Sequence, residues 1–543
     1  MDVRDDTFYD LIRQISGKLV AELLAFQECN GVDSFLGFNY SHLNQHDPDF
    51  DSDSDDSSGE EDEDSTGNCK DNKDSTEDDE DYVSDRLFKV SSPTFQGMRV
   101  LDFINPILAM SHLIVNISAT KKYLHKWTSP LTFWVINLHD GCRIDTTTLL
   151  QGLDQTVIIA DHVQRKNHYL TEFTRPHILF ARDKGPLAPF MYSHTSHSVP
   201  LSESDIRKFF NYYKTDSVMM SVNAFYCSFP SSLCEVYMPL NRTIIWLPAH
   251  RFTLARCSRP EIDQLILHMQ QSVRPEQQPK HFVAAGGRYD QEYIKYYTGL
   301  DAILLPTNSL WYAFNVTRFT QARTEILVGP LQTRNHPLMA NMKNAATALN
   351  SSFQFASAKN LYGHYHLQQI ADHRAVVLLP YAVLSYGITE LYALGIPIFV
   401  PSIDFIVKLN LVNDRTLIDP FYCGRSLKFD DMPKQHTNSH HPFSPEDIVS
   451  SEAIRYWLQF ADYYQLPYIQ TFSSWTNLIE KLSTTNFKTV HDNIHDENVR
   501  RKVELTKKWE SIFAKIDHMQ RVIPQDYDTA IKQLWNTTRL QAI

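Results

Sequence analysis

The stretch that decides the fold is Ala375–Ser402, which reads AVVLLPYAVLSYGITELYALGIPIFVPS. Its first apolar run, 375–380, predicts a buried strand, because strands of parallel sheets are apolar on both faces. A short turn and a helical pattern over 386–394 follow, and the apolar run 396–400 then predicts a second buried strand. The stretch therefore predicts one strand–helix–strand unit of an α/β fold.

The turn before the predicted helix is suited to bind an anion. The first turn of a helix presents backbone N–H groups that lack intrahelical partners, and the helix dipole favours negative charge there. Ser385 and Gly387 lie in this turn, and glycine lets a ligand approach the backbone closely. Glu390 lies about one turn further along, beside Thr389, where a carboxylate can accept hydrogen bonds from a ribose diol.

The same alternation of short apolar runs and helical stretches extends through most of the chain. Strands are predicted in one series at 131–138, 156–160, 177–181, 217–222, 243–248, 281–285 and 302–306, and in a second at 324–328, 352–356, 375–380 and 396–400. Helices are predicted between them, among others at 203–214, 260–273, 289–298 and 361–373. This order predicts two doubly wound parallel sheets that meet near residue 320.

The N-terminal part differs in composition from the rest. Residues 47–85 contain 19 Asp/Glu and two Lys, a local balance of −17 against −13 for the whole chain. Such a tract cannot bury enough apolar surface to offset its ordering entropy, so it is predicted to be disordered. It is interpreted as a solvated linker or as a tail for a basic partner. The remainder is nearly neutral, which favours neither nucleic acid nor an acidic membrane as a partner.

These patterns divide the chain into five segments. The predicted segments are an N-terminal helical segment (1–45), the acidic tract (46–90), a Rossmann-like acceptor domain (91–320), a Rossmann-like donor-binding domain (321–490) and C-terminal helices (491–543). In the last of these, the helical stretch 503–516 with Trp509 is expected to pack back on the first domain.

Composition also bears on compartment and metal chemistry. Seven cysteines in 543 residues exclude a disulfide-dense scaffold, and Cys227, Cys234 and Cys257 are expected to be buried thiols. The histidines 436, 440 and 441 lack the spacing of metal ligands, so no metal site is predicted. No signal peptide or membrane span is evident, which predicts a cytoplasmic location, with a Golgi-associated one as the alternative.

The helix and the following strand also carry a family resemblance. Glu390, Ala393, Gly395 and Pro397 form the pattern E-x-x-A-x-G-x-P, followed by an aliphatic residue. The pattern resembles the donor-binding signature of nucleotide-sugar-dependent glycosyltransferases with the GT-B fold. The resemblance implies that the helix N-terminus faces the donor pyrophosphate and that Glu390 binds the ribose. Retaining members commonly carry a second glutamate eight residues earlier, where this chain has Ala382, so the subfamily is not assigned.

Further candidate residues follow the ends of predicted strands, where ligands of such folds bind. Gly329 ends one strand, and Arg334 in the next loop is expected to neutralise donor phosphate, with a solvated loop arginine as the alternative. His139 and Asp140 follow strand 131–138, and His139 is a candidate general base. The alternative for this pair is a loop-capping histidine and a turn aspartate.

Other polar residues at strand ends are less specific. Arg251, Arg288 and Asp290 are interpreted as cleft lining, with surface salt bridges as the alternative. The double glycine at 286–287 would permit close ligand approach. The P-loop, nucleophile-elbow and zinc-protease motifs do not occur in the chain.

The sequence thus predicts a glycosyltransferase of the hexosyltransferase type. It would transfer a sugar from a UDP- or GDP-linked donor to a glycan, protein or small-molecule acceptor, without a further cofactor. The alternative is a non-catalytic GT-B-like binding or scaffold protein. A sugar-nucleotide epimerase would need an additional acid/base set, which the sequence does not identify.

Overall fold

The computed structural model describes the strand pair near residue 97 and most of the chain from residue 130 to 535. The described residues are 94–95, 98–99, 130–137, 140–159, 178–180, 202–249, 251–254, 256, 258–275, 277, 279–306, 309–314, 319–329, 337–363, 365–380, 383, 386–412, 432–516 and 523–535. The predicted N-terminal helical segment (1–45) and the acidic tract lie outside these residues.

The chain divides into two compact units, residues 1–103 and 104–543. In the first unit, the described residues form an antiparallel pair of short strands, β1 (Thr94–Phe95) and β2 (Met98–Arg99). The second unit holds all the other elements, and within it each of two sheets has its own strand order.

The first sheet has seven parallel strands in the order β5-β4-β3-β6-β7-β8-β9. In chain order its elements are β3 (Thr132–Asn137), α3 (Asp140–Gly152), β4 (Thr156–Ile159), β5 (Ile178–Phe180), α6 (Glu203–Tyr213), α7 (Ser217–Ser221), β6 (Ala224–Phe229), η3 (Ser231–Leu240), β7 (Thr243–Trp246), α8 (Arg259–Ser272), β8 (Phe282–Ala285), α9 (Arg288–Thr298) and β9 (Ile303–Leu304). From β3 at the centre, β4 and β5 are added on one side of the sheet, and β6 to β9 are added on the other side. This is the doubly wound order of a Rossmann fold.

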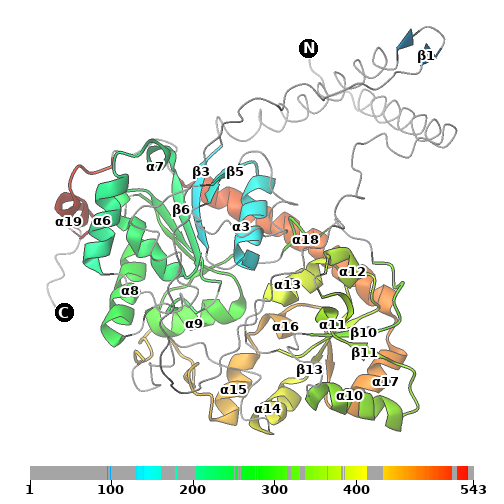
Figure 1. Cartoon of the computed structure of the whole chain (residues 1–543). Helices are drawn as coiled ribbons and strands as arrows, with labels where there is room; N and C mark the ends of the chain where they lie inside the picture. Colours follow the sequence, from blue (N-terminus) through cyan, green and yellow to red (C-terminus); the bar gives the residue numbers. More distant parts are fainter. Residues whose placement is uncertain are drawn as a thin grey trace, which may run out of the picture. The chain divides into compact units, whose positions relative to one another are not determined.

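Alternate side chains of these strands enter two different core layers. Trp134 of β3 and Trp246 of β7 pack with residues of α6, η3 and α8. Phe133 and Val135 of β3 pack on the other face, with residues of α3 and of the long helix α18 (Phe487–Phe513). Figure 1 shows α6 and α8 on one side of these strands and α3 and α18 on the other. Both faces are thus buried, as the continuous apolar runs predict.

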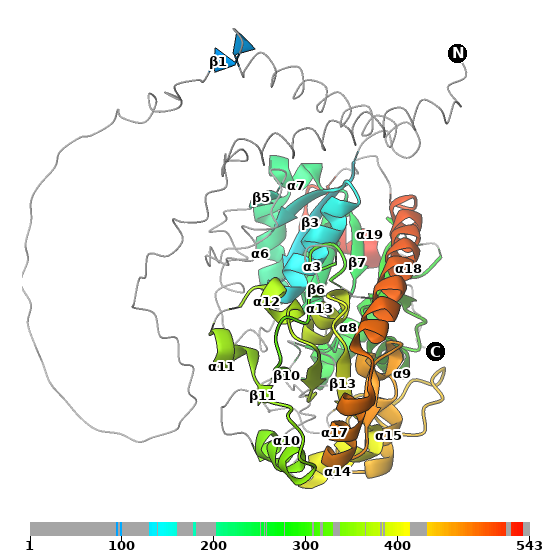
Figure 2. The ribbon, with the colours of Figure 1, turned by 90° about the vertical axis from the view of Figure 1, so that its right-hand side faces the viewer.

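The second sheet has five parallel strands in the order β11-β10-β12-β13-β14. Its elements are β10 (Ile326–Gly329), α10 (Pro337–Ala348), β11 (Phe355–Ala356), α11 (Ala358–Tyr362), α12 (Leu367–Ala371), β12 (Val376–Leu378), α13 (Tyr386–Ala393), β13 (Ile398–Pro401), α14 (Ile403–Val412), α15 (Ser451–Leu458), α16 (Asp462–Gln465), β14 (Gln470–Phe472) and α17 (Trp475–Thr484). Helices α10 and α17 lie side by side (Figures 1 and 2). The strand order is again doubly wound, so the predicted α/β fold with two Rossmann-like sheets is confirmed.

Two predicted elements were wrong in detail. The predicted strand 217–222 is the helix α7, because the Asp216 side chain accepts a hydrogen bond from the Met219 backbone N–H (2.8 Å) and caps it. The strand of this region is β6, which begins at Ala224. The predicted helix 361–373 is instead two short helices, α11 and α12, and Gly363 after the first has a φ of +68°.

The cysteine prediction was also wrong. Cys227 in β6 and Cys234 in η3 form a disulfide, with their Cα atoms 5.7 Å apart. Helix η3 turns back against β6, which brings residues seven positions apart into contact. Cys142 is buried and takes part in no disulfide among the described residues, and Cys257 lies outside them.

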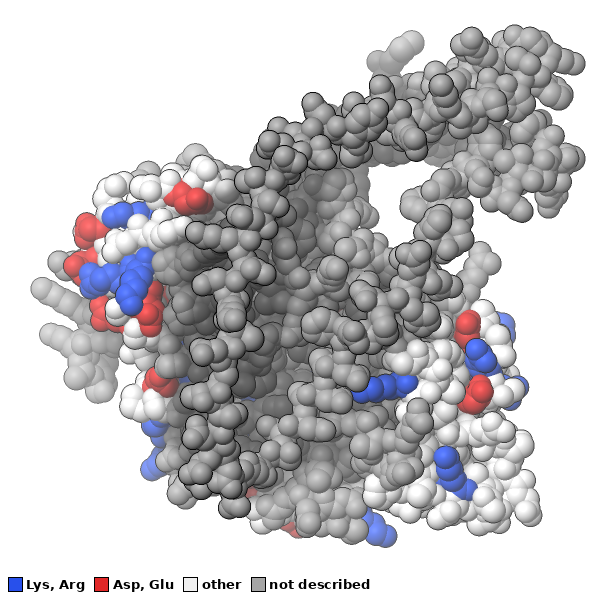
Figure 3. Space-filling model, viewed as in Figure 1, with Lys and Arg blue, Asp and Glu red and all other residues white. Residues whose placement is uncertain are grey.

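Charged side chains of both signs are interspersed on the described part of the face in Figure 3. On α6, for example, Arg207 pairs with Glu203 and with Asp528 of α19 (Tyr527–Trp535), while Lys208 pairs with Asp205. None of the helices in the described ranges combines the length and the apolar content needed to cross a membrane.

Candidate functional site

The strand orders locate the place where a ligand is expected to bind. In doubly wound sheets, ligands bind beyond the carboxyl ends of the strands where the strand order reverses. In the first sheet this point lies between β3 and β6, and in the second between β10 and β12. The loop from β3 to α3, the loop after β10 and the turn from β12 to α13 therefore start at these points. The predicted donor-site residues and the pair His139 and Asp140 belong to these three connections or to the elements that they join, whereas Arg251, Arg288 and Asp290 do not.

The structure describes only part of the predicted set. Gly329 is the last residue of β10, and a Cβ atom placed on it would meet nothing within 4 Å. Asp140 is the first residue of α3. His139, Arg334 and Ser385 lie outside the described residues.

The decisive stretch contains the expected strand, helix and second strand, which are β12, α13 and β13. Helix α13 begins at Tyr386 and places the exposed Gly387 in its first turn. It ends before Gly395, whose φ is +73°, a value that L side chains rarely adopt. A Cβ atom at this position would come within 2.7 Å of His491 Nδ1, which donates to the Gly395 carbonyl (2.7 Å). Glycine in the pattern is therefore required by both conformation and packing.

Glu390 lies on α13 in a protein-lined, partly buried environment. The Tyr312 hydroxyl donates a hydrogen bond to Glu390 Oε1 at 2.7 Å. Burial raises the pKa of Glu390, and the hydrogen bond from Tyr312 opposes that shift. Tyr365 is near enough for the Glu390 charge to raise its pKa, in addition to a larger effect of burial. Tyr365 itself is 37% exposed.

Tyr312 belongs to a buried turn, residues 309–314, that we call the junction segment. Ser309 Oγ lies 2.9 Å from Thr389 Oγ1, and the Ser309 backbone N–H donates to Asp145 Oδ1 of α3 at 2.9 Å. Lys502 Nζ of α18 donates to the Leu310 carbonyl at 3.3 Å. The junction segment thus bonds to α3, α13 and α18, and the Thr389 hydroxyl is engaged in this contact.

Sequence reasoning missed Tyr312, Ser309 and Asp145. The Tyr312–Glu390 bond joins residues 78 positions apart, and no local spacing links them. One local signal exists, since the junction segment is rich in aromatic residues directly after a predicted strand.

Arg251 was predicted to line a cleft, and this prediction was wrong. Its guanidinium is buried and donates to Glu446 Oε2 at 2.7 Å. The Tyr293 hydroxyl donates to the other oxygen of the same carboxylate, also at 2.7 Å. The segment 432–450 is therefore tied to the end of β7 and to α9. Arg288, by contrast, is exposed and pairs with Glu292 on its own helix.

A pocket of about 430 Å³ with several charged side chains in its lining lies near the ends of β8 and β9, against α16 and α18. Gly287 and Asp462 line it, and a Cβ atom on Gly287 would lie 2.8 Å from Asp462 Oδ1. Only glycine therefore allows this carboxylate so close to the start of α9. Asp290 is buried nearby, and its pKa is raised by burial and by the charge of Asp462.

We expect Asp462→Asn to stabilise the protein at neutral pH, by about 1–3 kcal/mol. Burial raises the pKa of Asp462 to about 6, against about 3.9 in an unfolded chain. Folding therefore favours the protonated carboxyl, so stability is lost as the pH rises through the folded-state pKa, and asparagine avoids this loss. Thermal midpoints at pH 4 and 7.5 measure the effect, which should shrink at the lower pH.

Asp301→Asn serves as the matched control for this prediction, because the Asp301 side chain is 86% exposed. It should change the thermal midpoint little at either pH. A variant Asp462→Asn that is less stable than the wild type at pH 7.5 would contradict the expectation.

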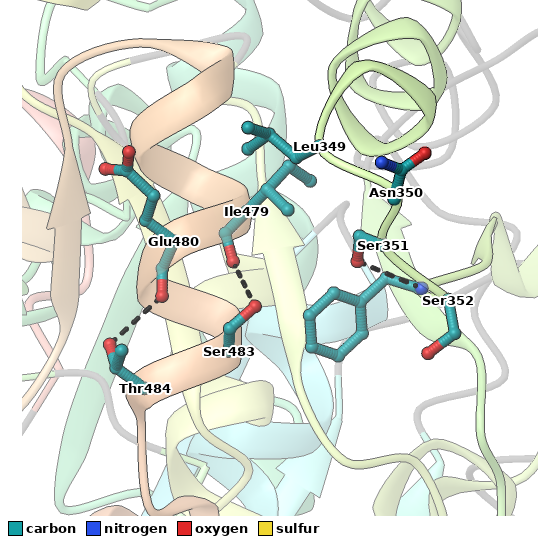
Figure 4. Close-up of a pocket in the computed structure, with 9 residues that line it drawn as sticks. Leu349, Asn350, Ser351, Ser352, Ile479, Glu480, Ser483 and Thr484 are labelled. Carbon is teal, nitrogen blue, oxygen red and sulfur yellow. Dashed lines mark hydrogen bonds between the residues drawn. The ribbon is translucent and has the colours of Figure 1, made fainter.

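Another pocket lies at the edge of the second sheet where its strands begin, opposite the edge that carries the candidate site. It has a volume of about 600 Å³ and is lined by residues 349–353, before β11, and by α17 (Figure 4). Because β11 starts at Phe355, this pocket adjoins the amino end of the strand, away from the carboxyl ends where Glu390 lies.

Histidines in segment 432–450 have structural partners. His441 Nδ1 lies 2.7 Å from the Tyr456 hydroxyl, and its Nε2 lies 3.2 Å from Glu292 Oε2. Within the described ranges, no group of three or more His, Cys, Asp or Glu side chains is arranged to hold a metal ion.

Several solved glycosyltransferases are similar to this chain. The glycotransferase of kitacinnamycin is 11% identical, with a TM-score of 0.35, over 72% of this chain and 100% of its own. The glycosyltransferase SnogD from Streptomyces nogalater is 12% identical, with a TM-score of 0.31, over 71% of this chain and 100% of its own. The spinosyn rhamnosyltransferase SpnG complexed with thymidine diphosphate is 12% identical, with a TM-score of 0.30, over 70% of this chain and 100% of its own. No family model and no curated protein matches the chain. The fold assignment rests on the two parallel sheets and their strand orders.

Proposed function

We propose that this protein is a glycosyltransferase that transfers a sugar from a nucleotide-sugar donor to an acceptor hydroxyl. The observation that carries the proposal is the position of Glu390. It lies within the E-x-x-A-x-G-x-P pattern, on a helix that follows the reversal point of the second sheet. This is the sheet edge where a nucleotide ligand of a doubly wound fold is expected.

The donor half of the proposed site uses the second sheet. The first-turn amides of α13 and Arg334 would hold the diphosphate, and Gly387 and Gly329 leave room for its close approach. Glu390 would accept hydrogen bonds from the ribose hydroxyls through its carboxylate oxygens. Ser385 is proposed to contact the same diphosphate, whereas Thr389 would act through the junction segment to which it bonds.

The acceptor half of the proposed site uses the first sheet. In an inverting reaction, His139 would take the proton of the acceptor hydroxyl as its oxygen attacks the anomeric carbon. The bond from that carbon to the diphosphate oxygen would break, and the α13 amides with Arg334 would stabilise the leaving diphosphate. Asp140, next to His139 at the start of α3, is proposed to orient the imidazole.

Nucleotide binding to the full chain tests the proposal. We expect UDP or GDP, or one of their sugars, to raise the thermal midpoint by mass action. Glu390→Gln should weaken that binding by about 10–100-fold, because a hydrogen bond to a charged group contributes about 1.5–3 kcal/mol. Thermal shift titrations give both quantities.

Glu480→Gln is the matched control, because Glu480 is an exposed glutamate of α17 that lines the pocket at the opposite sheet edge. It should leave nucleotide affinity unchanged. Failure of every nucleotide to shift the midpoint of a folded sample would refute the donor site and favour the non-catalytic scaffold.

A further inference from the structure

The junction segment connects the reversal points of both sheets through a chain of hydrogen bonds. Asp145 of α3 accepts from the Ser309 N–H, and Ser309 Oγ lies 2.9 Å from Thr389 Oγ1 and 3.0 Å from the Tyr312 hydroxyl. Tyr312 in turn donates to Glu390 Oε1. Helix α3 begins just after the reversal point of the first sheet, and α13 follows that of the second.

The packing of the junction segment fixes the position of Tyr312. The Tyr312 ring is 2% exposed and Ser309 is fully buried. The neighbouring Trp311 fits against α3 only because residue 152 is glycine, since a Cβ atom there would lie 1.9 Å from Trp311 Cδ1. The Lys502 ammonium lies over the rings of Trp311 and Phe314, at 5.2 and 5.9 Å from their centroids.

The Tyr312 hydroxyl makes the same kind of bond to Glu390 that a ligand hydroxyl would make. It is a neutral O–H donor at 2.7 Å from a carboxylate oxygen, the geometry of a charge-assisted hydrogen bond. Burial and the nearby Glu390 charge raise the pKa of Tyr312 well above its ordinary value, so the hydroxyl keeps its proton. Oε1 therefore already accepts one hydrogen bond, and a ligand diol that binds both carboxylate oxygens competes with the Tyr312 hydroxyl for this oxygen.

We infer that the Tyr312–Glu390 hydrogen bond is an autoinhibitory clasp, which a ligand diol at Glu390 must displace. The inference rests on the proposed function and concerns the regulation of the same site. Displacement breaks the bond between Tyr312 and α13. Ligand binding in the donor half then affects α3, because Ser309 of the junction segment bonds to both Tyr312 and Asp145. The structure holds the clasped form.

Tyr312→Phe tests the clasp, because it removes the hydroxyl and keeps the ring. Its nucleotide dissociation constant, measured on the full chain by calorimetry with UDP and GDP, should fall about tenfold relative to wild type. The lost bond no longer opposes the ligand, while the variant's ligand-free thermal midpoint should fall. The matched control is Tyr392→Phe. It removes the hydroxyl of a tyrosine on α13, the helix that carries Glu390, and this hydroxyl donates to the Pro467 carbonyl (3.1 Å). It should leave the dissociation constant unchanged.

Hydrogen exchange of the wild-type protein provides a second readout that needs no variant. Amides of residues 309–314 should exchange faster when nucleotide is bound, because the clasp has opened. An unchanged or weaker affinity in Tyr312→Phe, or slower exchange of this segment on binding, overturns the clasp while the donor site stands. Absence of nucleotide binding in wild type and both variants overturns the proposed function and the clasp with it.

Discussion

Replacing Glu446 by alanine is expected to lower the free energy of unfolding by about 3–5 kcal/mol. The Glu446 side chain is fully buried and that of Arg251 is 6% exposed, so their 2.7 Å ion pair lies in the interior. The alanine variant leaves a buried guanidinium without this carboxylate, and the Tyr293 hydroxyl loses its 2.7 Å hydrogen bond to Glu446. Urea unfolding, followed by circular dichroism, measures the loss as a lower midpoint.

Two controls separate loss of a buried charge from loss of a contact. The double variant Arg251→Met/Glu446→Leu replaces both charges by apolar side chains and should lie near wild type in stability. Lys488→Ala removes an exposed ion pair with Asp492 and should cost less than about 1 kcal/mol. A Glu446→Ala midpoint equal to that of Lys488→Ala would show that segment 432–450 is held by other contacts.

The strands of both sheets were largely predictable because each is buried on two faces. A strand such as Thr132–Asn137 then has a continuous apolar sequence, and ten of the eleven predicted strands overlap a strand of the structure. The exceptions have local causes. Asp216 caps a helix within an apolar run, which shifts the real strand to Ala224, and β14 (Gln470–Phe472) is too short and too polar to stand out.

The candidate site was predictable only where it is local in sequence. Glu390 and Gly395 belong to one pattern, and their helix and glycine turn form as that pattern indicates. The partners of Glu390 and Arg251 come from 78 and 195 residues away, and no spacing in the chain encodes such contacts. Arg251 was therefore interpreted as cleft lining, although it is buried and paired with Glu446, a residue far away in the sequence.

Trp509→Ala is expected to destabilise the protein by about 3–5 kcal/mol and to uncouple the two sheets. Trp509 of α18 is 1% exposed and stacks on Tyr226 of β6, with ring centroids 6.0 Å apart. The N-terminal half of the same helix bonds to helix α13 of the second sheet, since Asn498 Nδ2 donates to the Tyr392 carbonyl at 2.7 Å. Loss of the indole therefore weakens the attachment of α18 to the first sheet while its bond to α13 remains.

Differential scanning calorimetry distinguishes this uncoupling from a general loss of stability. Helix α18 and the junction segment both connect the two sheets, so the intact protein is expected to unfold in a single transition, and weakening the attachment of α18 is expected to separate the transitions of the two sheets. We expect Trp509→Ala to show two heat-absorption peaks, the lower one from the first sheet. Val503→Ala is the control on the same helix, because Val503 is 51% exposed and its truncation should change stability by less than about 0.5 kcal/mol. A single peak for Trp509→Ala at the midpoint of Val503→Ala would mean that the sheets are joined independently of α18.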